Sequence, residues 1–225
     1  MKKTCIIIAG GKSIREEWLN NGLFDHLRGK EIWALNYAYK TMPYLPSREL
    51  WVDESFFTNE KENLLLLGIK GVQLISQPSS LAGKGNKGKI KDYFDIIKLY
   101  NKTRDFTDQL KYEESIYTGL YSLVGLFALS VAIKEKYERI FLLGLDFGTP
   151  NIKDKDTHYY DGFISHKSRG AGDPKIYRNS NNILNEKIKD FKVYENTEAE
   201  IYNVSLRSNI DYFDKISYEE MYNLL

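Results

Sequence analysis

The stretch TCIIIAGGKSIREEWLNNG, residues 4–22, decides the fold class. Residues 4–9 form a continuous apolar run with several β-branched side chains, which is typical of a strand covered on both faces. The glycine turn GGKS follows at 10–13, and IREEWLNN then predicts a helix that ends at Gly22. Strand, glycine turn and helix in this order indicate the opening of a doubly wound α/β fold.

Later apolar runs predict further strands of the same sheet. Each is short and ends at or just before a polar residue, and they cover 31–36, 49–53, 72–76 and 139–144. Residues 114–136 are apolar on most sides of a helical wheel and predict one long buried helix that precedes the strand at 139–144.

The remaining tail alternates short elements. Its pattern predicts a helix over 181–191, short strands over 192–196 and 200–205, and a closing helix over 217–225. The chain contains no internal repeat and no linker composition. We therefore expect a single Rossmann-like domain over 1–225, with a mostly parallel sheet flanked by helices.

Composition and charge exclude several classes of protein. The 32 basic and 31 acidic residues leave a net charge of +1, so no overall field draws the chain to nucleic acid or to a membrane surface. The single cysteine, Cys5, cannot form an intramolecular disulfide, which fits a reducing compartment. The first apolar stretch spans about six residues, too few for a signal peptide or a membrane span. We expect a cytoplasmic protein.

Two segments are predicted to be loops. Residues 82–91 (AGKGNKGKIK) combine glycines and lysines and cannot pack into a core, so they form either a solvated charge run or a phosphate-binding lid. Residues 91–111 are expected to form an irregular insertion over the site. Residues 148–180 lack periodicity and contain two of the three histidines. A loop of that length predicts a lid over an active site.

Polar residues follow the predicted strands directly. Because ligands of open parallel sheets bind beyond the carboxyl ends of the strands, these residues are expected to line a nucleotide pocket. The set comprises Gly10, Gly11, Lys12, Ser13, Asn36, Asp53, Ser76 and Asp146. The turn is not an NTPase phosphate loop, since that motif needs a glycine at the position of Ile6, and the G-x-G-x-x-G fingerprint is absent. Its backbone N–H groups can still hold an anion.

A second cluster, THYYDG at 157–162, could supply a catalytic base. A neutral imidazole at His158 can take a proton from a sugar hydroxyl, with Asp161 orienting it or sharing that role and His166 four residues beyond. The alternative is a surface histidine in a polar loop. A metal held by these three side chains would match no tight ligand template, and we predict none.

These motifs together resemble a known family. The order strand-GGKS, a strand ending in Asn36, VDESFF, VGLFALSVAIKEKYERIFLLGLDFG and THYYDG is similar to that of the bacterial sialyltransferases of the Campylobacter lipooligosaccharide type. It also resembles their wider superfamily, which includes 6-hydroxymethylpterin diphosphokinase-like proteins and phage-encoded glycosyltransferases. Residues 124–147 match best. The tail EIYNVSLRSNIDYF is similar to a family ending that returns to the nucleotide site.

The resemblance implies roles for individual residues. It places the nucleotide against the glycine turn, Asn36, Asp53 and Gly125, and it matches His158 to a histidine of the S/T-H-aromatic loop. Gly148 stands where the sialyltransferases have a tyrosine on the donor phosphate, a role left to Tyr159 or Tyr160.

Two further positions depart from the family. Val124 replaces a serine that contacts cytosine, and Gly162 replaces the catalytic histidine, so His166 or Asp161 would have to serve. These departures argue against CMP-sialic acid as the donor.

The leading hypothesis is a metal-independent glycosyltransferase that needs no cofactor and moves a sugar from a nucleotide-sugar donor to a glycan or other hydroxyl acceptor. One alternative is a Mg²⁺-dependent pyrophosphoryl or nucleotidyl transferase with Asp53, Asp146 or Asp161 as ligands. Another is a non-catalytic nucleotide-binding module. A nucleic-acid acceptor would have to use the lysines of 82–91 and has little support from the net charge. Homo-oligomerisation is left open.

Overall fold

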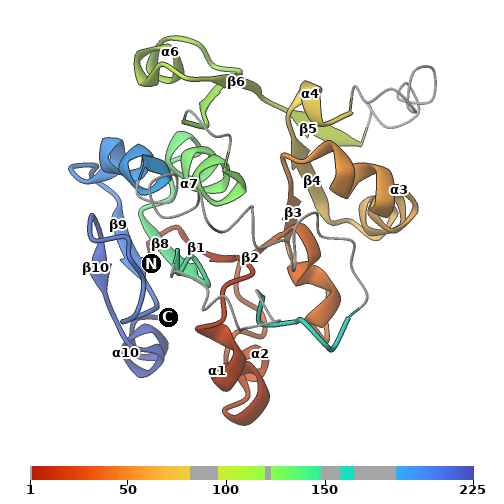
Figure 1. Ribbon diagram of the computed structural model, residues 1–225, viewed down its shortest axis with the longest axis vertical. Helices are drawn as coiled ribbons and strands as arrows, with labels where there is room; N and C mark the ends of the chain where they lie inside the picture. Colours follow the sequence, from red (N-terminus) through yellow and green to blue (C-terminus); the bar gives the residue numbers. More distant parts are fainter. Residues whose placement is uncertain (1, 82–95, 120–122, 148–157, 165–185) are drawn as a thin grey trace.

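Strand β1 (Thr4–Ile8) lies inside an eight-stranded sheet in the computed structural model, which describes residues 2–81, 96–119, 123–147, 158–164 and 186–225. The strand order is β10-β9-β8-β1-β2-β3-β4-β5, and every neighbouring pair is parallel (Figure 1). The other seven strands of this sheet are β2 (Ile32–Leu35), β3 (Arg48–Leu50), β4 (Gln73–Ser76), β5 (Ile97–Leu99), β8 (Arg139–Leu143), β9 (Glu200–Asn203) and β10 (Asp214–Lys215). The predicted α/β class with a mostly parallel sheet is confirmed.

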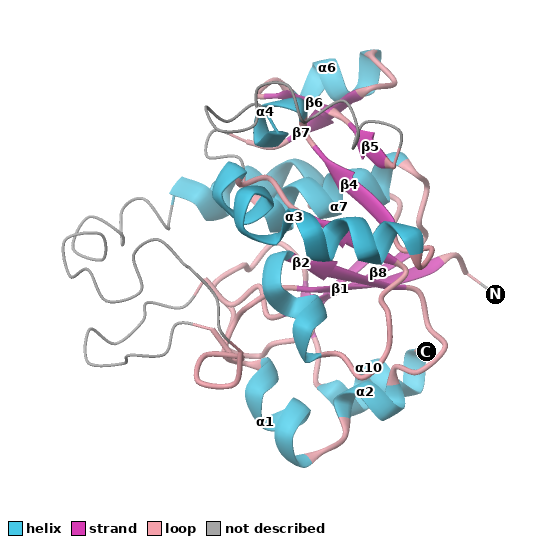
Figure 2. Ribbon diagram, turned by 90° about the vertical axis from the view of Figure 1, so that its right-hand side faces the viewer, coloured by secondary structure: helices cyan, strands magenta, loops and turns pink. Residues whose placement is uncertain are grey.

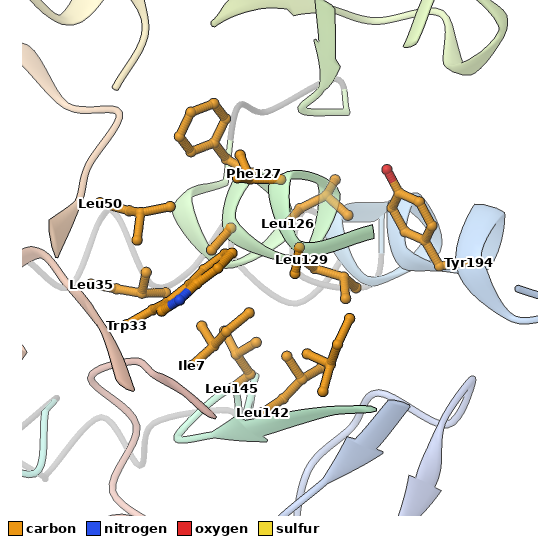
Figure 3. Packing of buried hydrophobic residues seen from close by; sticks show 14 of the residues in the cluster. Ile7, Trp33, Leu35, Leu50, Leu126, Phe127, Leu129, Leu142, Leu145 and Tyr194 are labelled. Carbon is orange, nitrogen blue, oxygen red and sulfur yellow. The ribbon is translucent and has the colours of Figure 1, made fainter. Parts of the chain in front are cut away.

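Helices cover both faces of the sheet, which is why its central strands can be apolar on every side. Helix α7 (Val124–Lys134) packs on one face, and Figure 3 shows Leu126 and Leu129 of this helix above side chains of β1, β2 and β8. The other face is covered by α1 (Ile14–Asn20), α2 (Leu23–His26), α3 (Glu54–Ile69) and α10 (Tyr218–Leu224).

A small second sheet lies beside α7. Its strands β6 (Asn101–Thr103) and β7 (Ser115–Tyr117) are parallel and joined by α6 (Phe106–Lys111), and Figure 2 shows them at the end of the molecule opposite α1, α2 and α10. Gln109 of α6 is buried and its side-chain oxygen accepts hydrogen bonds from Tyr117 N and Tyr194 Oη at 2.7 and 2.9 Å. These bonds fix the small sheet to the main core.

The small sheet corrects two predictions. The helix predicted over 114–136 is wrong in its first part, because Ser115–Tyr117 form β7 and the helix begins at Val124. An apolar run is compatible with a buried strand as well as with a buried helix. Here residues 115–117 pair with β6 and therefore form a strand. The segment 91–111 was predicted to be irregular, yet from 97 onward it contains β5, β6 and α6.

Other elements also differ from the sequence pattern. The strand predicted over 192–196 is wrong, since a 3₁₀ helix, η2 (Asp190–Tyr194), occupies most of it and buries Phe191 and Tyr194 three residues apart. Residues 186–189, within the helix predicted over 181–191, are helical. Helix α3 was not predicted at all. The short elements η1 (Asn36–Thr41) and α4 (Pro78–Leu81) complete the described secondary structure.

Some predictions lie outside the described residues. These are the basic loop 82–91 and, except for 158–164, the predicted lid 148–180. Within the part of the chain that is described, no helix is long and apolar enough to cross a membrane.

Candidate functional site

The strand order places a switch point between β1 and β8. After β1 the chain adds β2, β3, β4 and β5 on one side, and later it returns to add β8 and β9 on the other. Ligands of open α/β sheets bind at the carboxyl ends of the strands that flank such a point. Here that edge is formed by the residues that follow Ile8 and Leu143, where Ala9 N donates to Leu143 O at 2.8 Å and Gly11 N donates to Gly144 O at 2.8 Å.

The two glycines of the GGKS turn are required by close packing. A Cβ on Gly11 would lie 2.5 Å from Asp146 Oδ2 and closer still to the carbonyl oxygen of Gly144. A Cβ on Gly10 would lie 2.5 Å from His158 Cδ2. Neither position can hold a larger residue without moving its neighbours, so the turn touches both the end of β8 and the segment that carries His158.

Asp146 fastens the start of α1 to the end of β8. Its carboxylate accepts hydrogen bonds from Ser13 N at 2.8 Å and from Ser13 Oγ, while its carbonyl oxygen accepts one from Asn209 N at 2.9 Å. A carboxylate beside the first turn of a helix is also favoured by the helix dipole. In this arrangement both carboxylate oxygens of Asp146 are occupied by Ser13.

The turn 158–164 lies directly over Gly10. Tyr159 N donates to Gly10 O at 2.9 Å, and the Tyr159 hydroxyl lies 2.7 Å from Thr41 Oγ1 in η1. The Tyr160 ring is stacked on the His158 imidazole with centroids 5.0 Å apart and an interplanar angle of 5°. The glycine turn after β1, Thr41 of η1 and the described part of the predicted lid therefore meet in one place.

His158 is held by the carboxylate of its own turn. Asp161 Oδ2 accepts a hydrogen bond from His158 N at 2.7 Å, and Oδ1 lies 3.6 Å from His158 Nδ1. The imidazole keeps about a third of its surface exposed, at 33%, whereas the Asp161 side chain is 10% exposed. Nδ1 therefore faces the carboxylate, and the far ring nitrogen, Nε2, is the one that can receive a proton. Arg15 Nη2 donates to Asp161 O at 3.3 Å and closes the turn.

Tyr159 and Tyr160 are both buried. Burial raises the pKa of each phenol, so both hydroxyls keep their protons and can act as donors at neutral pH. The Tyr159 hydroxyl already has Thr41 as a partner, and the Trp18 ring packs edge-on against its ring with centroids 5.3 Å apart.

Asn36 and Asp53 lie at the carboxyl ends of β2 and β3. Asn36 has a φ of +53°, rare for a residue other than glycine, and its Oδ1 is buried with no hydrogen-bond partner among the described residues. Asp53 precedes α3 without capping it and is exposed, yet desolvation by surrounding protein raises the pKa of its carboxyl, an effect that the charge of Lys187 partly opposes.

The remaining predicted site residues have varied positions. Ser76 is buried and donates to Trp51 O at 2.8 Å, so its hydroxyl ties β4 to the end of β3. Gly125 is buried near the start of α7 against the Leu145 side chain. Lys12 lies in the turn before α1, and His166 falls outside the described residues. Within the described ranges no three His, Cys, Asp or Glu side chains cluster as metal ligands.

The structure thus brings one group of predicted residues together and leaves others apart. The first group is Gly10, Gly11, Ser13, Asp146, His158, Tyr159, Tyr160 and Asp161. No described contact joins Asp53 to this group. Sequence reasoning missed Thr41 and Arg15, which carry no motif and are recognisable only by their tertiary hydrogen bonds. Asn209, which donates to Asp146 O, belongs to the tail segment 200–213 that the resemblance brought toward the nucleotide site.

Comparison with known proteins supports the fold. Two solved structures resemble the chain, each with a TM-score of 0.53 and 18% identity over 96% of this chain and 86% of theirs. One is the sialyltransferase CST-II in complex with a trisaccharide acceptor and CMP, and the other is CstII from Campylobacter jejuni in complex with the substrate analogue CMP-3FNeuAc. No family model matches the chain, and no curated protein matches it significantly. At this identity the likeness establishes the fold.

Proposed function

We propose that the chain is a glycosyltransferase that moves a sugar from a nucleotide-activated donor to an acceptor hydroxyl without a metal ion. The observation that carries the proposal is the meeting of the GGKS turn with the His158 turn at the switch point of the sheet, where Tyr159 N donates to Gly10 O. The GGKS turn offers the charge of Lys12 and the backbone N–H of Gly10 to an anion, and the His158 turn offers a base. Both halves of a group transfer therefore lie side by side.

The donor nucleotide is proposed to bind along the carboxyl ends of β1, β2 and β8. Support comes from the buried Oδ1 of Asn36, for which the described part of the chain supplies no hydrogen-bond partner, and from the likeness to structures that hold CMP or a CMP-sugar analogue. The charge of Lys12 and the backbone N–H of Gly10 would stabilise the phosphate as it leaves, since Gly11 N and Ser13 N already donate to Gly144 O and Asp146 Oδ2. The hydroxyl of Tyr160 would donate to it as well. The departing nucleotide would thereby be neutralised by the protein itself.

The acceptor is proposed to be activated by His158. Its Nε2 accepts the proton of the attacking hydroxyl, and the carboxylate of Asp161 beside Nδ1 stabilises the imidazolium that forms. The acceptor oxygen forms a bond to the anomeric carbon of the sugar, and the bond from that carbon to the phosphate oxygen breaks. The electron pair of the broken bond leaves with the nucleotide, so no oxidant or further reactant is required.

Nucleotide binding is the first test. A thermal-shift screen with CMP, UDP, GDP, ADP and ATP, with Mg²⁺ or with EDTA, separates the hypotheses. A metal-independent shift with a nucleoside mono- or diphosphate is expected. A shift seen only with a triphosphate and Mg²⁺ would replace glycosyl transfer by pyrophosphoryl or nucleotidyl transfer, and no shift with any nucleotide would refute the proposal.

Turnover tests the base. Nucleotide release from nucleotide sugars is measured for the unmodified protein, for His158→Ala and for the control His26→Ala, since the His26 ring is stacked on Tyr222 with centroids 4.2 Å apart in a separate part of the fold. Loss of a general base lowers kcat by roughly 100-fold or more. His158→Ala should show that loss and His26→Ala should not. Full turnover by His158→Ala would remove this residue from the mechanism.

A further inference from the structure

Glu49 is a fully buried carboxyl group in the middle of the sheet. It lies on β3 between Ala34 of β2 and Leu74 of β4, with 0% of its surface exposed. Neither of its carboxyl oxygens has a hydrogen-bond partner among the described residues. An ionised carboxylate in such surroundings is very unfavourable, and the usual response is that the group keeps its proton.

A second buried carboxyl nearby takes the available donors instead. The carboxylate of Glu60 on α3 accepts hydrogen bonds from Tyr39 Oη and Lys40 Nζ, both at 2.7 Å, and from Asn63 Nδ2 at 2.8 Å. Burial alone would raise the pKa of Glu60, but these bonds outweigh it and the pKa is lowered. For Glu49, burial and the charge of Glu60 both raise the pKa. The two carboxyl groups therefore lie in opposite surroundings, which favour the ionised form of Glu60 and the protonated form of Glu49.

Glu49 faces the same side of the sheet as the His158 turn. Trp51, two residues further along, shares that face and packs in one cluster with Tyr159 and Tyr160. A negative charge at Glu49 would act on both tyrosines, since it raises the pKa of each. Tyr160 is stacked on His158, and Tyr159 N is bonded to Gly10, so a disturbance of this pair would reach the candidate base.

We propose that Glu49 keeps its proton in the folded protein and is a positioning residue for the His158 turn, which loosens when rising pH ionises Glu49. The titratable and charged groups around it are Glu60 of α3, with Lys40 attached to it, Tyr37 and Tyr39 of η1, and Tyr159 and Tyr160 of the turn; Ala34 and Leu74 beside it on the sheet contribute none. The protonation of Glu49 is independent of the proposed function, whereas its importance for catalysis rests on the role proposed for His158.

The proton is tested by unfolding in urea between pH 4.5 and 9. Because the folded protein binds the extra proton, the contribution of Glu49 to stability should fall as pH rises above about 4.5, the ordinary pKa of glutamic acid, until pH reaches the raised pKa of Glu49. Glu49→Gln removes this dependence, so the folding constant of the variant relative to the unmodified protein should rise by up to about tenfold per pH unit. Parallel profiles would overturn the proposal.

Glu60→Gln is the matched control, because the lowered pKa of Glu60 gives the opposite sign. That group stabilises the fold above its ordinary pKa and loses the effect as pH falls, so the Glu60→Gln profile should approach that of the unmodified protein at acid pH. If Glu49→Gln fails to fold, Glu49→Leu removes the ionisable group with a side chain of similar size, and the same pH dependence is expected from it.

The positioning role is tested by the NMR signals of the His158 ring, assigned by their loss in His158→Gln. Between pH 4.5 and 9 these signals should show, besides the titration of the imidazole itself, a second shift or broadening in the unmodified protein that is absent from Glu49→Gln. Identical behaviour of the two proteins would refute the positioning role. If the unfolding profiles diverge as expected while no nucleotide binds, the proposed function fails and the protonation of Glu49 stands.

Discussion

Replacement of Gly11 by alanine tests the junction between β1 and β8 directly. Gly11 does not have a positive φ, so alanine adds no backbone strain, and the effect comes from the Cβ alone. That atom would lie 2.5 Å from Asp146 Oδ2 and closer to the Gly144 carbonyl, which already accepts the hydrogen bond from Gly11 N. A backbone carbonyl cannot rotate away as a side chain can.

The expected loss of stability is about 3 kcal/mol. Overpacking in a tight interior costs roughly 1–3 kcal/mol, and displacing Gly144 O or Asp146 weakens one or two hydrogen bonds worth about 1 kcal/mol each. Urea unfolding followed by tryptophan fluorescence measures this loss, and the thermal shift with nucleotide should fall with it because the anion-binding turn is distorted.

Gly71→Ala provides the comparison. Gly71 has a φ of +91°, and no atom lies within 4 Å of the place that a Cβ would take, so alanine there should cost only the backbone term of about 1–2 kcal/mol and leave nucleotide binding intact. A Gly11→Ala protein within about 0.5 kcal/mol of the unmodified one would show that the β1–β8 junction is looser than described, and the steric reasoning would be refuted.

Three further substitutions give graded outcomes in the same unfolding assay. Asp146→Asn replaces one of the two carboxylate oxygens that accept hydrogen bonds from Ser13 with an NH₂ group. This change should cost about 2 kcal/mol of stability and weaken nucleotide binding, and unchanged stability would contradict the proposed link between α1 and the end of β8. Tyr159→Phe removes the contact with Thr41 and should cost about 1 kcal/mol, and no loss would mean that the turn is held by its backbone bond alone. Ser217→Ala breaks the capping box with Glu220 and should cost about 1 kcal/mol without changing nucleotide binding; a binding defect would link α10 to the site.

The parts of the fold that follow from local pattern could be predicted. Residues 4–9 and 139–144 are buried on both faces, so their apolar character is continuous, and both appear as strands close to the predicted bounds. Residues 115–117 could not be assigned in this way, because a buried strand and a buried helix have the same apolar content. Helix α3 was not predicted, because its apolar side chains are spread around the helix and form no clear apolar stripe.

The residues of the candidate site also fall into those that local pattern predicts and those that it does not. Gly10, Ser13 and Asp146 were found because the edge of a parallel sheet follows from where its strands end. Thr41 and Glu49 were not found. Their roles depend on tertiary neighbours: Thr41 contacts Tyr159, and Glu49 is buried in the sheet. No local sequence pattern indicates such neighbours for a hydroxyl in a short helix or a charged residue in a strand.

The position of β1 between β2 and β8 also bears on how the chain assembles during synthesis. β1 leaves the ribosome long before its partner strand β8, which is more than a hundred residues behind it, so one edge of β1 is unpaired while β2, β3 and β4 form. An apolar strand with a free edge is prone to join other chains. Nascent or truncated chains that stop short of Leu143 should therefore depend on chaperones far more than the finished protein does.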